Sequence, residues 1–187
     1  MTQPEQLQDS EIIGHTKNWL EQVVIGLNFC PFAGREFRKG SIHYIVLNSS
    51  DRKEILTRLA LEFHRLDDHP EIETTLIILP GQFPDFNKYL DIIELCQDLL
   101  EEEDYEGIYQ VASFHPDYRF AGAAPDDPAN FTNRSIYPML HLLREESIER
   151  VLENYRDPDS IPANNIAFAK QKGFAAMEAL RNACLVR

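Results

Sequence analysis

The chain has 187 residues, 43% of them hydrophobic, and a formal net charge of -13 at pH 7. This length can bury one core, so we expect a single domain over residues 1–187. No apolar run is long enough to cross a bilayer, and no basic stripe is available to neutralise phosphates. The N-terminus is polar and acidic, unlike a signal peptide. We therefore expect a cytoplasmic protein with no membrane contact and no nucleic-acid partner.

The first half of the chain predicts alternating helices and strands. Apolar residues recur at three- and four-residue spacings over 11–27, which predicts an amphipathic helix. The segment 41–49 is rich in β-branched residues and predicts a strand. Asp51 is suited to cap a second helix. The nearly continuous apolar run 74–80 is typical of a strand that is buried on both faces.

The second half predicts one more strand, at 108–114, after a helix capped by Asp85. Pro138 is suited to begin a helix that includes 139–147, and Ser147 begins or continues another short helix over 148–155. Pro162 opens a long C-terminal helix that is expected to bend at Gly173.

This order of elements predicts an α/β fold, because strand-helix-strand units favour parallel pairing. We expect a small, mainly parallel sheet of about three strands covered by helices, with an all-helical C-terminal part. The irregular stretch 114–135 has room for a fourth strand.

The long irregular stretch contains the first candidate for chemistry, His115. Ligands of open parallel sheets bind beyond the carboxyl ends of the strands, where His115 leaves the third predicted strand. A histidine at this place is a candidate general acid or base. The alternative is that it caps the strand through hydrogen bonds across the loop.

Two arginines of the same stretch suggest an anionic substrate. Arg119 follows His115 by four residues, and Arg134 lies beside Asn133 just before a predicted helix start. Guanidinium groups, an amide and a helix N-terminus suit a phosphate or carboxylate. The alternative is that both arginines pair with nearby aspartates and fix the loop.

Cys30 is a second catalytic candidate. If residues 31–37 form a short helix, its dipole and nearby Arg35 would lower the pKa of the Cys30 thiol and make a nucleophile. If Cys30 instead ends the first helix, the dipole disfavours the thiolate. In a parallel sheet, Cys30 and His115 are expected on opposite sides unless the loop after Cys30 folds back across an edge.

Known metal and cofactor motifs are missing from the sequence. The three cysteines (Cys30, Cys96 and Cys184) are widely spaced and are expected to be reduced thiols. His64 and His69 are five residues apart, and His141 is expected alone on an amphipathic helix, so no metal site is predicted. Dinucleotide fingerprints and phosphate-binding loops are absent, which leaves the cofactor open.

Acidic residues are concentrated in one segment. Nine of them lie between Asp85 and Glu106, with Lys88 as the only basic residue. The simplest interpretation is a solvated helix face. The alternative is that its acidic end at 98–106 docks a basic protein partner.

Four stretches, "NFCPFA", "SFHPDYRFAG", "NRSIYPMLHLLREESIERV" and "IPANNIAFAKQKG", resemble an uncharacterised bacterial protein family known only as a domain of unknown function, number 1415. The resemblance covers nearly the whole chain. It implies a bacterial, single-domain, cytoplasmic protein and transfers no catalytic residue.

The sequence thus leads to two hypotheses. The first is a small-molecule enzyme, a hydrolase or group transferase, or a binding protein, with an anionic ligand held by Arg119, Asn133 and Arg134. His115 would act as acid or base, and Cys30 with Arg35 would form a second cluster. The second hypothesis is a noncatalytic interaction module that uses the acidic segment 98–106.

Overall fold

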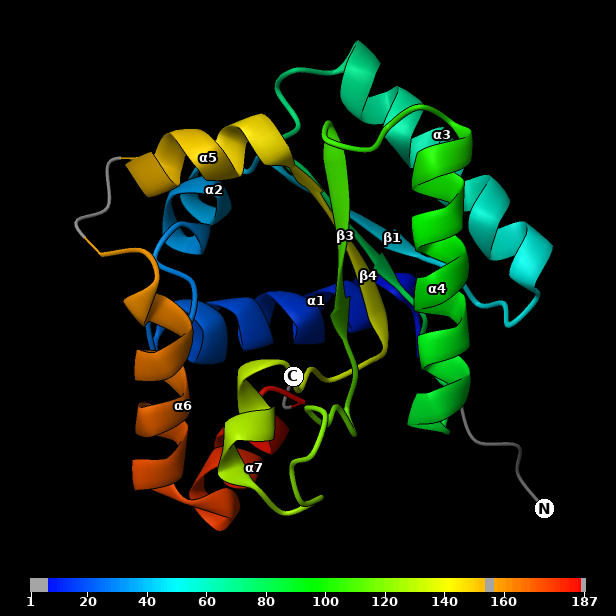
Figure 1. The fold of residues 1–187 in the computed structure, drawn as a ribbon. Coiled ribbons are helices and arrows are strands. Elements are labelled where there is room, and N and C mark those ends of the chain that lie inside the picture. The colour runs from blue at the N-terminus through cyan, green and yellow to red at the C-terminus, as the bar shows by residue number, and fades with distance from the viewer. Residues whose placement is uncertain (1–6, 154–156, 186–187) are drawn as a thin grey trace, which may run out of the picture.

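The computed structural model describes residues 7–153 and 157–185 and consists of a four-stranded sheet between two layers of helices (Figure 1). The strands are β1 (Ile42–Val46), β2 (Thr74–Ile78), β3 (Tyr109–Phe114) and β4 (Met139–Arg144). Their order across the sheet is β1-β2-β4-β3. β1 pairs parallel with β2, whereas β4 pairs antiparallel with both β2 and β3.

The helical elements follow the chain. They are α1 (Asp9–Trp19), the π-helix η1 (Leu20–Ile25), α2 (Ala33–Lys39), α3 (Arg52–Asp68), α4 (Phe86–Glu102), the 3-10 helix η2 (Pro128–Thr132), α5 (Glu145–Glu153), α6 (Ser160–Lys172) and α7 (Phe174–Ala183). The helix predicted over 148–155 corresponds to α5, and the end of that prediction lies outside the described residues.

The predicted sheet of about three mainly parallel strands was wrong in one respect. The three predicted strands do run in one direction, but a fourth strand lies between two of them, so the sheet is mixed. This strand is β4, where we expected a helix, and it lies beyond the stretch 114–135. Because β4 is central and buries side chains on both faces, its sequence "MLHLLR" shows no alternation that would distinguish a strand from a helix.

Local signals at the helix ends were predicted more successfully. The Asp51 side chain accepts a hydrogen bond from the Glu54 backbone N–H at the start of α3. Asp85 does the same for Asn87 at the start of α4. Gly173, with φ 81° and ψ 159°, separates α6 from α7, so the predicted C-terminal helix is broken there rather than only bent.

The first face of the sheet is covered by α3 and α4 (Figure 1). Their buried side chains, such as Leu59, Phe63 and Ile92, form one core with Ile77 of β2 and Leu140 of β4. The helices α3 and α4 therefore cover the central strands of the sheet on this face.

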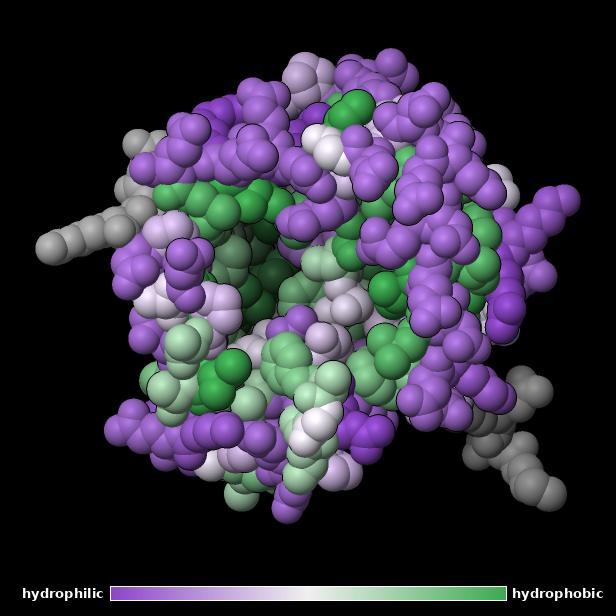
Figure 2. Space-filling view, in the orientation of Figure 1, coloured by the Kyte–Doolittle hydropathy of each residue, from purple (hydrophilic) through white to green (hydrophobic). Residues whose placement is uncertain are grey.

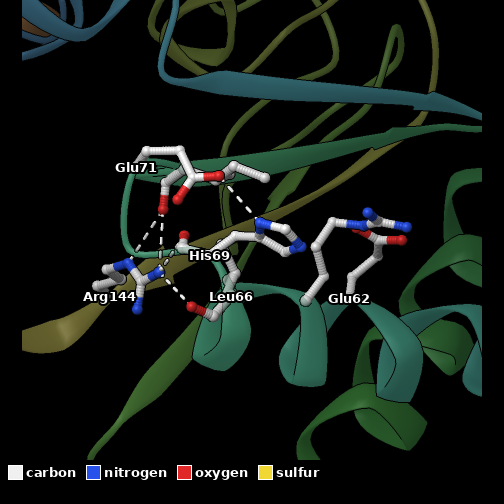
Figure 3. Close-up of polar contacts among 7 residues, drawn as sticks. Glu62, Leu66, His69, Glu71 and Arg144 are labelled. Atoms are coloured by element: carbon white, nitrogen blue, oxygen red, sulfur yellow. Dashed lines mark hydrogen bonds and ion pairs between the residues drawn. The ribbon is translucent and has the colours of Figure 1, made fainter.

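The C-terminal end of α3 is fastened to the sheet by one arginine of β4. The Arg144 guanidinium donates hydrogen bonds to the backbone oxygens of Leu66 and Ile72, at 2.5 and 3.0 Å (Figure 3). Cations at a helix C-terminus satisfy carbonyls that have no partner within the helix. The Arg144 contacts therefore fix the direction of α3 across the first face.

The second face of the sheet is covered by α1, η1, α6 and α7, which form a separate core. Trp19 is central to it, with 1% of its surface exposed, and its ring contacts Phe114 of β3 edge to face. Nowhere in the described part of the chain is a helix both long and apolar enough to cross a membrane.

Candidate functional site

The second face of the sheet is covered at one end and open at the other. Three rows of side chains cross it, and the strand register assigns each row. The first row, at the carboxyl ends of β1, β2 and β3, consists of Val46, Ile78, Met139 and Phe114. The middle row consists of Tyr44, Leu76, His141 and Ala112. The third row consists of Ile42, Thr74, Leu143 and Gln110.

Burial decreases from the first row to the third. Ile78 and Met139 are buried in the first row, and Leu76 alone is buried in the middle row. In the third row Thr74 is buried, whereas Gln110 at the β3 edge is exposed. The middle and third rows therefore form an accessible and mostly apolar floor. The second core covers the first row and also packs on Leu76, Tyr44 and Ile42 at the β1 and β2 side, so the less covered part of the floor lies on β3 and β4.

Helix α5 lies over this open floor without joining either core. Its three apolar residues, Ile148, Val151 and Leu152, are half-buried, and none belongs to the two core clusters. None of the residues of α5 is buried. An amphipathic helix normally buries its apolar stripe against a neighbour. Here the apolar stripe of α5 forms a wall.

Figure 2 shows the resulting cleft as a deep hollow with apolar side chains on its inner surface, between α5, α6 and the sheet. The half-buried apolar side chains that pack on the second core include Phe37 of α2 and Phe168 of α6. We call this hollow the second-face cleft. Concave, mostly apolar sites with a few polar groups are the usual form of small-molecule sites.

His141 is the main polar group on the floor of the second-face cleft. Its Nε2 lies 2.7 Å from Thr74 Oγ1, and Phe114 contacts its ring. The same Thr74 hydroxyl donates to the Leu142 backbone oxygen, which can only accept. Thr74 therefore accepts the Nε2–H of His141, and the Nδ1 atom of the neutral ring is the unprotonated one.

The Nδ1 atom of His141 is not among the fully buried atoms that lack a partner in the described residues. No other described residue donates a hydrogen bond to it, and the buried side-chain atoms without a partner in the described chain are Glu62 Oε1 and Thr75 Oγ1. Burial lowers the pKa of His141 to about 4, although the residue as a whole is half-buried rather than buried. A titratable side chain with a pKa shifted by burial that is still only half-buried is typical of the floor of a cleft.

Tyr44 supplies a second polar group in the middle row. Burial raises the pKa of Tyr44 to about 12, so the phenol is neutral at pH 7. Leu76 lies between Tyr44 and His141, which places the two Cα atoms about 10 Å apart, since neighbouring strands are about 4.8 Å apart. Lys17 of α1 lies over the Tyr44 ring, 5.1 Å from its centroid, and adds a cation at the β1 side of the floor.

His115, the predicted acid or base, lies on the other face of the sheet. Its Nε2–H donates to the Phe83 backbone oxygen at 2.8 Å, and its Nδ1 accepts from the Asp117 backbone N–H at 2.9 Å. Its ring also contacts Tyr89 of the first core. Burial lowers the pKa of His115 against the opposing effect of the Phe83 hydrogen bond. Both ring nitrogens of His115 are used in hydrogen bonds to loop backbone atoms. This is the arrangement expected if His115 caps the strand rather than acting as an acid or base.

Arg134 is buried and fixes the loop 114–135 through backbone oxygens rather than through aspartates. Its Nε donates to Tyr118 O at 3.0 Å, and its Nη2 donates to Pro125 O at 2.7 Å. Its guanidinium lies 4.9 Å from the Phe131 ring centroid. Arg181 of α7 lies on the same ring at 5.6 Å and donates to Pro116 O. Burial and the neighbouring Arg181 lower the pKa of Arg134.

The other two residues of the predicted anion site do not join Arg134 in one pocket. Asn133 contacts Ser113 O at 3.4 Å and Thr132 Oγ1 at 3.2 Å. Arg119 is exposed. The loop thus uses the hydrogen-bonding groups of His115 and Asn133 and two donors of Arg134, while Arg119 remains at the surface.

Cys30 lies on the second face of the sheet, at the N-terminal side of α2. This corresponds to the alternative in which a short helix follows Cys30. Burial raises the pKa of the Cys30 thiol, although hydrogen bonds from the Phe32 and Ala33 backbone N–H groups oppose this. The expected lowering of the thiol pKa was therefore wrong. Arg35 is exposed and pairs with Glu36 at 3.4 Å. Cys30 packs on the second core, whereas His115 contacts the first, so the sheet separates these two catalytic candidates.

A charged cluster on the first face links α3 to β1. The Glu62 carboxylate is fully buried and pairs with Arg65 at 3.0 Å and with His43 at 3.8 Å. Figure 3 shows it beside the exposed pair of His69 and Glu71. Within residues 7–153 and 157–185, no group of three or more His, Cys, Asp and Glu side chains could hold a metal ion.

Sequence reasoning missed the residues of the second-face cleft. His141 was placed alone on a helix, and Tyr44 was read only as part of a strand. One signal was available, because α5 has a strongly one-sided sequence with Ile148, Val151 and Leu152 on a single face. That pattern requires an apolar neighbour, but it does not say that the neighbour is an open floor.

The family model described as "Protein of unknown function (DUF1415)" matches residues 11–179. The chain belongs to this family. The match includes α1 through most of α7, and with them every element that borders the second-face cleft. No curated protein and no solved structure matches the chain. The resemblance stated from the four sequence stretches is confirmed.

Proposed function

We propose that the protein binds a small molecule with an apolar body in the second-face cleft. The observation that carries this proposal is the incompletely covered middle row of the sheet, with the half-buried His141 and Ala112 at its floor and the apolar side of α5 above it. Burying apolar ligand surface there would gain about 25 cal/mol for each Å² removed from water. A preformed cleft avoids the cost of ordering a loop on binding.

Binding is a simpler conclusion than catalysis for this site. The cleft offers a neutral imidazole and a neutral phenol, and burial holds the Cys30 thiol in its protonated form. A hydrolase or group transferase would need an activated nucleophile or a base with a pKa near 7. An enzymatic role at this site is therefore a weaker proposal.

An anionic ligand, expected from the sequence, is still a proposal of its own. Two donors of Arg134 are occupied by carbonyls of the loop, so Arg119 at the surface or Lys17 at the edge of the cleft floor would have to contact the anion. Lys17 is the better placed of the two, since it lies beside the cleft. The binding experiment therefore compares probes with and without an anionic group.

The experiment measures binding of N-phenyl-1-naphthylamine, a neutral fluorescent probe, by its increase in emission. Ala112 lies next to His141 in the middle row, and Ala112→Trp should fill the cleft floor. The matched control is Ala60→Trp, because Ala60 is also half-buried but lines a groove between α3 and α4. We expect binding to the wild type and to Ala60→Trp, and at least tenfold weaker binding to Ala112→Trp.

Two results would contradict the proposal. One is no saturable binding to the folded wild type. The other is loss of binding in Ala60→Trp with retention in Ala112→Trp, which would move the site to the groove on the opposite layer. The sulfonated analogue 1-anilinonaphthalene-8-sulfonate tests the anionic group: tighter binding than the neutral probe supports an anionic ligand, and weaker binding argues against it.

A second candidate function is docking of a basic, amphipathic protein segment between α3 and α4. The observation in its favour is an open, mostly apolar groove with Leu61 51% exposed on its wall and Glu103 of the acidic segment 98–106 among its lining residues. Arg52 and Lys53 also line the groove, so a basic segment would have to place its lysines toward Glu103. A helical peptide with leucines on one face and lysines on the other should bind in this groove. Leu61→Asp should weaken the binding of this peptide. Equal binding of a peptide with glutamate in place of lysine would contradict this candidate.

A further inference from the structure

We infer that the ligand of the second-face cleft presents a hydrogen-bond donor, such as a hydroxyl or an N–H group, to His141 Nδ1. This inference rests on the proposed function and specifies the chemistry of its ligand. It follows from the way in which one threonine fixes the proton of the imidazole.

The first step concerns the proton of the Thr74 hydroxyl. Thr74 Oγ1 makes a very short contact with the Leu142 backbone oxygen. A hydrogen bond between these two oxygens needs a proton, and the carbonyl has none to give. The single hydroxyl proton of Thr74 is therefore directed at Leu142.

The second step concerns the imidazole. Thr74 Oγ1 is also 2.7 Å from His141 Nε2, and its proton is already committed. The contact is a hydrogen bond only if Nε2 carries the proton and donates it to the hydroxyl oxygen. A neutral ring then has its lone pair at Nδ1, which is an acceptor.

The third step concerns the direction of Nδ1. His141 lies in the middle row of the second face, beside Ala112 and Leu76, and no other described residue donates to its Nδ1. The imidazole lies on the second face of the sheet, which is the side on which the second-face cleft lies. Covering it with an apolar ligand would leave an acceptor without a partner, which is unfavourable. A ligand with a donor at this place restores the hydrogen bond.

The fourth step excludes the opposite polarity. A ligand acceptor, such as a carboxylate oxygen, facing Nδ1 would require a protonated imidazolium. Thr74 gives no compensating negative charge, and no Asp or Glu lies in the three rows of the floor. Any anionic group of the ligand would therefore be directed away from His141, toward the side of the floor where Lys17 lies.

The test compares two nearly isosteric probes in two proteins. N-phenyl-1-naphthylamine carries an N–H between its ring systems, and 1-phenoxynaphthalene carries an ether oxygen at the same position. His141→Phe keeps a ring on the floor but removes the acceptor. His69→Phe is the matched control, because His69 is exposed at the end of α3 on the other face. Affinities are measured at pH 7, with circular dichroism to verify folding.

We expect the amine to bind the wild type and His69→Phe about threefold to tenfold more tightly than the ether does, which is the range of one net hydrogen bond. In His141→Phe, the two probes should bind equally. Equal affinities in the wild type, or a preference for the amine that persists in His141→Phe, would overturn the inferred donor while leaving the cleft as a binding site. Binding of neither probe to the wild type would overturn the proposed function as well.

Discussion

Helices cover the two faces of the sheet to different extents in this protein. On the first face, α3 and α4 bury even the side chains of the edge strand, so that Val111 of β3 is only 6% exposed. On the second face, His141 and Ala112 in the middle row are both partly accessible, and α5 stands over them without entering a core. The first face is covered more completely, although His43 and Ile45 of the edge strand β1 are only half-buried there. The second face keeps more apolar surface open, where the ligand is proposed to bind.

The difference has a simple physical origin. The β2–α4–β3 and β1–α3–β2 connections each place a 17-residue helix on the first face. The second face is covered by α1 and by segments that follow β4, and these pack at the end where Trp19 contacts Phe114. Apolar surface left open is unusual in soluble proteins unless it has a partner. The difference in covering supports the proposal that the ligand binds on the second face.

The largest expected effect is on the first face. Phe63 is fully buried and stacks on Tyr109 with ring centroids 5.6 Å apart. Phe63→Ala should lower the free energy of unfolding by about 3–5 kcal/mol, as deletions of buried aromatic rings do. Val151→Ala on α5 should lower it by less than about 1 kcal/mol, since its side chain lies outside both cores. Urea denaturation measures the free energy of unfolding of both variants. Equal losses would contradict the different contributions that we assign to the two faces.

The second prediction concerns the closed end of the second face. Arg134→Met removes two hydrogen bonds to Tyr118 O and Pro125 O and leaves these acceptors without their donor. We expect a loss of about 2–3 kcal/mol in the free energy of unfolding. Arg119→Met is the control, and it should change stability by less than about 0.5 kcal/mol because Arg119 is exposed. A small effect of both substitutions would mean that the loop is not held by Arg134.

The third prediction uses the pH dependence of stability. The pKa of His141 is lowered to about 4 in the folded protein, against about 6.5 in an unfolded chain, so the unfolded state takes up the proton first as the pH falls. The contribution of His141 is complete above pH 6.5 and is lost between pH 6.5 and 4, by about 1–3 kcal/mol. The wild type should therefore lose more stability than His141→Phe over this range. Parallel curves would show that His141 titrates normally.

The smallest expected effect is on thiol reactivity. Burial raises the pKa of Cys96 on the first face to about 12, and it raises the pKa of Cys30 on the second face while leaving that side chain partly accessible. Iodoacetamide should therefore label Cys30 before Cys96, with a rate that still rises above pH 9. Peptide mass spectrometry assigns the sites. A labelling rate of Cys30 that reaches its plateau below pH 8 would restore the activated thiol that the sequence suggested.

Most of the fold could be predicted from local patterns. The periodicity of α3 and α4, their caps Asp51 and Asp85, and the apolar run of β2 are all properties of short segments. β4 could not be predicted in this way. Its residues Met139 and Leu140 serve opposite faces of the sheet, so its identity depends on two partner strands that are distant in sequence.

The candidate site was predicted less well, for a related reason. His115 does leave the carboxyl end of a strand, as expected, but its role depends on Phe83 O, which comes from the loop after β2. Arg134 likewise binds carbonyls that the loop brings to it. His141 became a candidate only when the strand register placed it beside Ala112 on an open face. Local sequence indicates which residues are capable of chemistry, and the packing of distant segments decides which of them remain accessible.

The account depends most on His141 being a deep, neutral acceptor that faces the second-face cleft. The ¹⁵N chemical shifts of the His141 imidazole test this directly in the folded protein. We predict a proton on Nε2 at pH 7, a titration midpoint near pH 4, and a shift of the Nδ1 signal when N-phenyl-1-naphthylamine is added. A midpoint near 6.5, a proton on Nδ1, or an Nδ1 signal that saturating probe does not move would contradict it.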